Sequence, residues 1–156
     1  MCMSCSALSS IVLPTLTVST VDCGHFLYGS SLAEVDLSPL AGVKGNILFD
    51  FSFRLCSKLE SLDFTPLAYT PMFYSNTFSG CTKLSTIILP FMTAPATDSY
   101  TFGTSTSSGL SQYTGYSTRG RNVLYVPNGA TGYDTDVWLD PLQDSNKCGF
   151  TISYTL

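Results

Sequence analysis

The chain has 156 residues, of which 44% are apolar and 12% are charged, and its formal net charge is −4. This length and apolar content suffice for one domain with a buried core. An acidic chain without a cluster of Lys and Arg is poorly suited to a phosphate backbone, which argues against nucleic-acid binding. A membrane span needs about 20 apolar residues, whereas a run such as "TIILPFM" (86–92) is short and contains Pro90, so no span is expected.

The N-terminal segment "MCMSCSALSSIVLPTL" (1–16) does not have the pattern of a signal peptide. It has no basic stretch before its apolar residues, and Pro14 interrupts it. It also begins the first of four similar units.

The pattern F-x-x-C-x-x-L-x-x-I-x-L recurs between residues 2 and 92 and is clearest in "FRLCSKLESLDF" (53–64) and "FSGCTKLSTIIL" (78–89). The positions of its Cys, 5, 29, 56 and 81, are 24, 27 and 25 residues apart. A repeat of this length predicts a solenoid, in which each coil buries its apolar side against its neighbours. The aligned apolar positions, with one more residue at the end of each unit, are Cys2, Cys5, Leu8, Ile11, Leu13 and Leu16; Phe26, Gly29, Leu32, Val35, Leu37 and Leu40; Phe53, Cys56, Leu59, Leu62, Phe64 and Leu67; and Phe78, Cys81, Leu84, Ile87, Leu89 and Met92.

The I-x-L part of each unit predicts a short β-strand, because its apolar residues alternate with a period of two. Equivalent strands of successive coils would pair about 4.8 Å apart in a parallel sheet. We therefore expect one short strand per coil, with loops and short 3-10 turns on the other side.

Residues 93–122 interrupt the repeat with a segment rich in Ser, Thr, Gly and Tyr, and 37 residues separate Leu89 from Val126. We interpret the segment as a long loop or hairpin inserted before a fifth strand, "VLYVP" (123–127). It is either a flexible surface loop or a ligand loop, since Tyr among Ser and Gly suits adaptable recognition. In the second case, Tyr113, Tyr116 and Arg119 would make the contacts.

Residues 123–156 are expected to provide the last strand and a C-terminal cap, which makes residues 1–156 a single domain. The stretch "GATGYDTDVWLDPL" (129–142) predicts a turn or two of helix before Pro141 and contains Trp138, the single Trp. The alternating sequence "FTISYTL" (150–156) predicts a final half-buried strand.

The first coil has no comparable cap. The residues "MCMSCSA" (1–7) carry no charge, so they offer no polar lid for the apolar residues that follow. Solenoids normally cover such an end, and a large exposed apolar patch usually marks an interaction site. We therefore expect self-association through this coil, or its coverage by an upstream part of the chain or another subunit.

The repeated motif resembles the leucine-rich repeats of the BspA-like family of bacterial surface proteins, whose units read much like "F.GC..L..I.LP". The resemblance covers residues 2 to about 92 and continues in "LYVPNGATGYDTDVW" (124–138), which is similar to the closing segment of that family. It implies a leucine-rich-repeat solenoid at the cell surface or outside the cell, with adhesion or binding of a protein or glycan as its function. Gly29 in place of Cys, Cys2 in place of Phe and the break after Met92 depart from the family pattern.

The resemblance brings no catalytic residues, and the reactive residue types do not add any. Cys5, Cys56 and Cys81 share one column, where small buried thiols pack well, so free core thiols are expected. Cys2 and Cys5 have metal-ligand spacing but no second pair of ligands, and His25 lies in no recognisable catalytic motif. We expect no enzyme activity, no metal and no cofactor.

The outward-facing strand positions are the remaining binding candidates, because acidic residues would cluster there in the second and third coils. Such a patch is either a solvated face that discourages lateral aggregation or a surface for a basic or cation-bridged partner. The alternative to an adhesion module is a structural or receptor-contacting component of a larger assembly, such as a phage or surface appendage, which the uncapped first coil favours. The candidate residues on the sheet face are Glu34, Asp36, Glu60, Asp63 and Tyr125.

Overall fold

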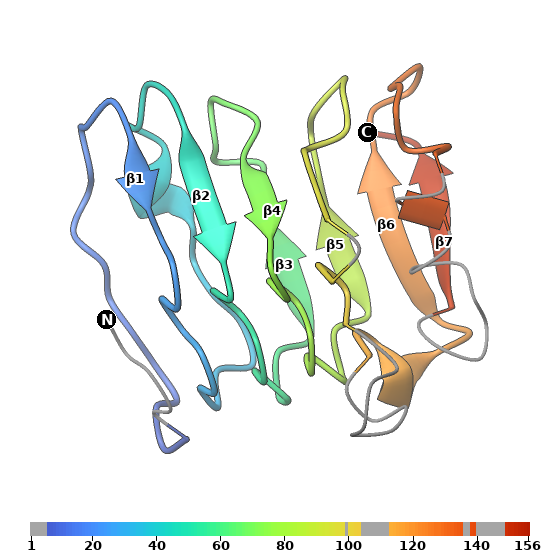
Figure 1. Cartoon of the computed structure of the whole chain (residues 1–156), viewed down its shortest axis with the longest axis horizontal. Coiled ribbons are helices and arrows are strands. Elements are labelled where there is room, and N and C mark those ends of the chain that lie inside the picture. Colours follow the sequence, from blue (N-terminus) through green and yellow to red (C-terminus); the bar gives the residue numbers. More distant parts are fainter. Residues whose placement is uncertain (1–5, 99, 104–112, 136–137, 140–148) are drawn as a thin grey trace.

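The chain winds into a parallel β-solenoid of about four turns (Figure 1). The computed structural model describes residues 6–98, 100–103, 113–135, 138–139 and 149–156. Within these residues, sheet A has the strand order β1-β2-β4 and consists of Val21–Asp22, Ile47–Asp50 and Met72–Tyr74. Sheet B has the order β3-β5-β6-β7 and consists of Ser61–Asp63, Thr86–Ile88, Asn122–Val126 and Phe150–Tyr154. Two 3-10 turns, η1 (Ser38–Leu40) and η3 (Tyr116–Thr118), are found in the connections of this part of the chain.

The core lies between the two sheets. Phe49 in β2 and Phe73 in β4 contact Phe64, which follows β3, with ring centroids 5.8 and 5.2 Å apart. All three side chains are fully buried. Because successive coils repeat this arrangement, each coil buries its apolar residues against the next, which is the main source of stability in a solenoid.

The expected solenoid is confirmed, whereas the expected single sheet with one strand per coil is wrong. Sheet A occupies the side for which the sequence predicts only loops and short 3-10 turns. Its strand β2 alternates buried Ile47 and Phe49 with partly exposed Leu48 and Asp50, which is the period of a half-buried strand. This alternation lies outside the repeated motif, so the motif alone does not indicate it.

The first two units are less regular than the sequence predicts, since residues 6–20 and 31–37 form no strand. Backbone hydrogen bonds still join the first coil to the second: Ser31 N–H donates to Leu8 O (3.1 Å) and Leu16 N–H to Pro39 O (2.8 Å). Pro14, which has no N–H to donate, lies in this segment and limits regular ladder pairing.

Hydrogen bonds between coils place Leu27, rather than Phe26, in the column of Phe53 and Phe78. The backbone N–H groups of Leu27, Phe53 and Phe78 each donate to a carbonyl of the following coil, at 2.9, 3.0 and 2.9 Å. Leu27 is fully buried and Phe26 only half-buried. The motif begins one residue later in the second unit than the sequence alignment predicts.

The same shift places Ser30, rather than Gly29, in the cysteine column. Ser30 Oγ lies 3.4 Å from Cys56 Sγ. Gly29 has a left-handed backbone (φ 68°), as Gly80 does in the fourth unit (φ 79°), and a residue without Cβ adopts this conformation without strain. The following turn is one residue shorter, so Leu32 keeps its expected buried position.

Residues 93–122, expected as an insertion, partly continue the solenoid. Just before this segment, Phe91 rather than Met92 takes the core position, and Met92 is 57% exposed. Ala96 then forms a parallel bridge with Met72 of β4, which extends sheet A by one more coil. Residues 104–112 lie outside the described part of the chain.

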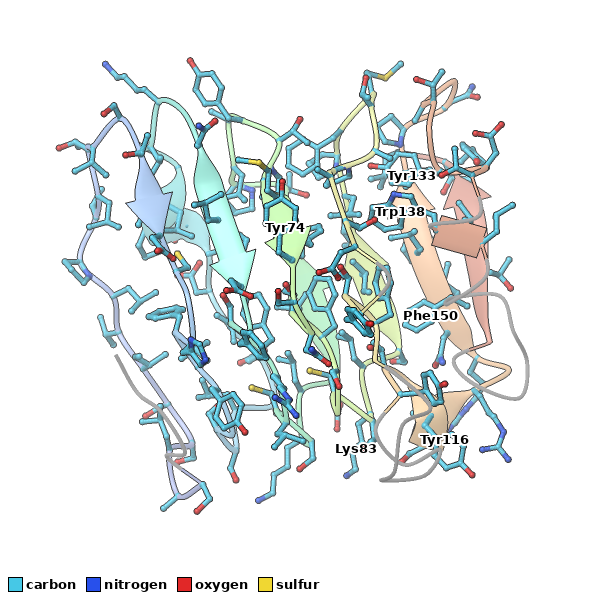
Figure 2. All side chains as sticks on the ribbon, viewed as in Figure 1. Tyr74, Lys83, Tyr116, Tyr133, Trp138 and Phe150 are labelled. Atoms are coloured by element: carbon cyan, nitrogen blue, oxygen red, sulfur yellow. The ribbon has the colours of Figure 1, made fainter. Side chains whose placement is uncertain are left out.

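A row of aromatic rings runs through successive coils and ends in the C-terminal cap. Phe53 and Phe78 stack at 5.9 Å, Phe102 follows Phe78 at 5.5 Å, and Trp138 follows Phe102 at 5.4 Å. Tyr133 packs against Trp138 at 5.1 Å, and Figure 2 shows both rings near β6. Strand β7 pairs in parallel with β6 as the expected final strand. Residues 136–137 and 140–142 of the expected helical segment lie outside the described residues.

Candidate functional site

The four acidic residues predicted on the sheet face, Glu34, Asp36, Glu60 and Asp63, are all exposed, and Tyr125 in β6 is half-buried. Two of them have a local structural role. One carboxylate oxygen of Asp36 accepts the backbone N–H of Ser38 at 2.8 Å, and one of Asp63 accepts that of residue 65 at 2.7 Å.

These contacts are Asx turns, in which an Asp side chain accepts the N–H two residues further along and fixes a corner of the backbone. Sheet A uses the same device, since Asp22 accepts from Gly24 N–H at 2.7 Å and Asp98 from Tyr100 N–H at 3.0 Å. The hydrogen bonds from the backbone and side chain of Ser38 lower the pKa of Asp36 below its ordinary value. Asp36 and Asp63 therefore each fix a corner of the backbone, a role that the sequence alone does not indicate.

The three residues predicted in the ligand loop are not equivalent. Tyr113 is buried (3% exposed), so the expectation that it contacts a ligand at the surface is wrong; its ring fills the core instead. Tyr116 begins η3 and is half-buried, and the Arg119 guanidinium lies 4.5 Å from its ring centre. Only Arg119 of the three is fully exposed.

A polar hollow lies at one edge of sheet B, where its parallel strands begin. Glu60, Ser85 and Arg121 each directly precede a strand (β3, β5 and β6). Parallel pairing places Glu60 beside Ser85, and Arg121 lies one residue before Asn122, the β6 position that is level with Ser85. The turn η3 lies over the same edge because Ser117 N–H donates to the Thr82 carbonyl at 2.8 Å. The resulting edge pocket encloses about 450 Å³ and is lined by Glu60, Lys83, Ser85, Ser117, Thr118 and Arg121.

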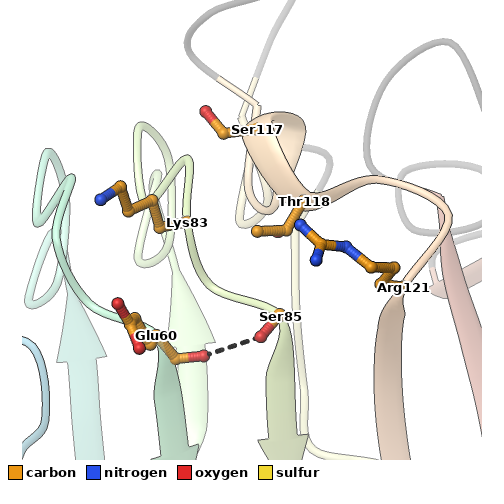
Figure 3. A pocket seen from close by; sticks show the side chains of 6 residues that line it. All are labelled: Glu60, Lys83, Ser85, Ser117, Thr118 and Arg121. Atoms are coloured by element: carbon orange, nitrogen blue, oxygen red, sulfur yellow. Dashed lines mark hydrogen bonds between the residues drawn. The ribbon is translucent and has the colours of Figure 1, made fainter.

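The charged groups of the edge pocket are not neutralised by one another. Within the described residues, Lys83, Arg121 and the Glu60 carboxylate make no ion pair or side-chain hydrogen bond. The dashed contact in Figure 3 joins Ser85 Oγ to the main-chain carbonyl of Glu60 at 3.3 Å. The figure shows Lys83 and Arg121 on either side of Ser85, with the Ser117 and Thr118 side chains near them. The pocket therefore offers two cations, one carboxylate and hydroxyl groups to a ligand.

Of the pocket residues, only Glu60 is among the candidates from the sequence. Lys83 has one sequence signal, since Lys58 stands at the same position of the preceding unit, in "CSKL" against "CTKL". Such a pair places two cations at one edge of a repeat structure. Arg121 and the η3 hydroxyls belong to the irregular segment, where no repeat position indicates their place.

The cysteines of the repeat column connect neighbouring coils. Cys56 Sγ donates to the Leu27 carbonyl at 3.0 Å, and Cys81 Sγ donates to the Phe53 carbonyl at 2.8 Å. Both thiols are free and buried, as the sequence predicts. Burial raises the pKa of Cys81 well above its ordinary value, which disfavours a reactive thiolate there. The hydrogen bond with Cys81 lowers the pKa of Cys56 to about 7, so burial alone protects the Cys56 thiol. The N-terminal cysteines 2 and 5 lie outside the described residues.

The single histidine has a packing role. The His25 ring stacks on Phe51 with centroids 4.8 Å apart. It also lines a shallow hollow of about 660 Å³ over sheet A, together with Asp22, Asp50 and Tyr74. In the described part of the chain, no group of three or more His, Cys, Asp or Glu side chains is placed to hold a metal ion.

No family model, no curated protein and no solved structure matches the chain. The resemblance to BspA-like repeats therefore depends on the sequence motif alone. The described residues include no helix with both the length and the apolar character that crossing a bilayer requires.

Proposed function

We propose that this chain is a non-enzymatic binding module and that the edge pocket binds an anionic group of a protein or glycan ligand. The observation that carries the proposal is that Lys83 and Arg121 both line the 450 Å³ hollow and that neither forms an ion pair within the described structure. A ligand anion between them would gain two charge-assisted contacts, which are stronger than neutral hydrogen bonds.

The surroundings of the pocket support the same proposal. Lys58 and Arg119 are exposed at neighbouring places, one in the preceding coil and one just after η3. In a chain with a net charge of −4, four cations along one edge form a local positive field. Such a field attracts an anionic ligand despite the overall charge and weakens as salt is added.

The repeat motif supports a place for the module at the cell surface or outside the cell, as in the BspA-like leucine-rich-repeat proteins that it resembles. Adhesion through the edge pocket is the corresponding function. This part of the proposal depends on resemblance, since a fold alone does not determine a function.

A specific observation favours the second candidate, a component of a larger assembly. Val12 in the first coil is 96% exposed. Beside it, a hollow of about 320 Å³ is lined mainly by apolar side chains, including Leu13, Leu16 and Phe26. An exposed apolar end of this kind suits contact with another copy or another subunit.

The test of the main proposal is polyanion binding by the purified chain. Polygalacturonate, heparin and poly-glutamate serve as anionic probes, and dextran is the neutral reference. We expect salt-sensitive binding of at least one polyanion, weakened about tenfold or more, or about 1.4 kcal/mol, in a Lys83→Gln/Arg121→Gln double variant.

The matched control is Lys44→Gln, an exposed cation before β2 in sheet A. The strands of the two sheets run in opposite directions in Figure 1, so Lys44 lies toward the opposite edge of the solenoid. The control variant should bind like the unmodified chain. Equal binding by the double variant, or no binding of any polyanion, contradicts the proposal.

A further inference from the structure

We infer that the edge pocket is built for a uronic acid, a sugar ring that carries a carboxylate, and that it selects this class over sulfate, phosphate and neutral sugars. The inference rests on the proposed function and names the ligand of the same site. It follows from the one acidic side chain in the pocket and from the direction of the hydroxyl hydrogen bonds.

Glu60 makes a purely anionic ligand unfavourable. Its carboxylate lines the same hollow as Lys83 and Arg121, and an ionised carboxylate can only accept hydrogen bonds. Sulfate and dianionic phosphate also present mainly acceptors, so they would be repelled by this group. A ligand that suits all three residues brings negative charge for the cations and a hydrogen-bond donor for Glu60.

The hydroxyl groups of the pocket point to the same requirement. Ser85 Oγ donates its hydrogen to the Glu60 main-chain carbonyl at 3.3 Å, and Thr118 Oγ1 donates to the Gly115 carbonyl at 3.2 Å. Each hydroxyl has one hydrogen and two acceptor lone pairs. With the hydrogens of these two hydroxyls engaged inside the protein, their lone pairs remain for the ligand, so a ligand that donates suits them. Sugar hydroxyls do this, whereas sulfate oxygens do not.

Arg121 supplies the matching contact for the carboxylate. Its planar guanidinium can bind both oxygens of a carboxylate in parallel, a geometry that a lysine cannot reproduce. Lys83, on the other side of Ser85 in Figure 3, adds a compact positive charge. A volume of about 450 Å³ lies within the range of about 300 to 1,000 Å³ that is usual for small-ligand sites.

The repeat adds a way to bind a polymer of such sugars. Lys58 stands one coil before Lys83 at the same position of the motif, and neighbouring parallel strands are about 4.8 Å apart. A polyuronate that lies along this edge would therefore meet a cation at two successive coils. The chain length of the ligand should consequently raise its affinity.

Calorimetric titration with trigalacturonate, maltotriose, inorganic sulfate and triglutamate tests the inference on the full chain. We expect trigalacturonate to bind at least about tenfold more tightly than each of the other three probes. Maltotriose has the donors without the charge, sulfate has the charge without the donors, and triglutamate represents an acidic peptide.

The diagnostic variant is Glu60→Gln, which keeps the size of an exposed side chain while its charge is removed. It should weaken trigalacturonate binding, because an ionised acceptor of sugar hydroxyls is lost, and strengthen sulfate binding, because the repulsion is lost. Glu34→Gln, an exposed acid outside the edge pocket, is the matched control and should change neither. Circular dichroism establishes that each variant is folded.

The outcomes separate this inference from the proposed function. If Glu60→Gln strengthens the binding of both anions, or if sulfate or triglutamate binds as tightly as trigalacturonate, the uronate inference is overturned while anion binding at the pocket stands. If trigalacturonate does not bind at all while another polyanion does, the uronate inference alone is overturned. If trigalacturonate binds equally well to the Lys83→Gln/Arg121→Gln variant, both are overturned.

Discussion

Replacing Phe78 by alanine should remove a central ring from the stacked row of the core. The side chain is 1% exposed, and its ring lies 5.9 Å from Phe53, 5.5 Å from Phe102 and 5.0 Å from Phe73. A buried Phe→Ala change costs about 3 to 5 kcal/mol. With Phe64 at 6.4 Å, Phe78 has four aromatic neighbours. Such contacts, each worth about 0.5 to 1.5 kcal/mol beyond area burial, favour the upper half of that range.

The measurement is denaturant unfolding followed by circular dichroism, with a thermal melt beside it. A loss of about 4 kcal/mol corresponds to a melting temperature about 8 to 16 °C lower for a domain of this size. Tyr100→Ala is the control, since Tyr100 is 52% exposed and should lose less than about 1 kcal/mol. A loss below about 1 kcal/mol for Phe78→Ala as well would refute the stacked-row account of the core.

Cys56 and Cys81 should react with a thiol reagent only after denaturation because both are buried, and fast labelling of the native chain or a disulfide between them, mapped by mass spectrometry, would contradict this. The lowered pKa of Asp36 means that its ionised form stabilises the fold above its ordinary value of 3.8 and that this contribution disappears as the pH falls through the folded-state pKa. The melting-temperature difference between the unmodified chain and Asp36→Ala should therefore shrink on acidification, whereas a difference that stays constant, or one matched by Glu34→Ala, argues against the Asx turn as its source. Self-association through the first coil should raise the sedimentation coefficient as the protein concentration increases, and Ile11→Lys should remove this dependence. A chain that sediments as a monomer at all concentrations would exclude self-association.

The repeat motif predicts much of the fold because the same physical requirement acts on every coil. The motif residues must lie over their counterparts in the next coil, as Phe53, Cys56 and Leu59 do. Their spacing in the sequence therefore indicates the solenoid. The buried cysteines follow from the same pattern, whereas the final strand follows from the alternation of residues 150–156. The motif does not predict sheet A, because the strands of this sheet lie between the motifs. Their alternation of buried and exposed residues is only a few residues long in each coil.

The errors of register have a common cause. Alignment by residue type favours Phe26 over Leu27 and Met92 over Phe91, since one aromatic or apolar residue resembles another. Inter-coil hydrogen bonds show the register of the second unit and place Leu27 inside. At the end of the fourth unit, burial shows that Phe91 rather than Met92 lies in the core. A pattern with a fixed period does not indicate that one turn of the second unit is one residue shorter.

The edge pocket was only partly predictable for a related reason. Glu60 and Lys83 belong to regular units and have repeat positions, whereas Arg121 and the η3 hydroxyls come from the irregular segment 93–122. Their approach depends on the Ser117 contact with the preceding coil, which no local spacing encodes. Tyr113, which shares this segment, turns inward because the core at this level still needs a large apolar side chain.

A crystal structure of the chain with trigalacturonate bound tests the central claim most directly. We expect a uronate carboxylate between Lys83 and Arg121, with sugar hydroxyls donating to Glu60, Ser85 or Thr118. Ligand bound over sheet A, beside Asp22 and Asp50, or at the edge pocket with its carboxylate turned away from both cations, would contradict it.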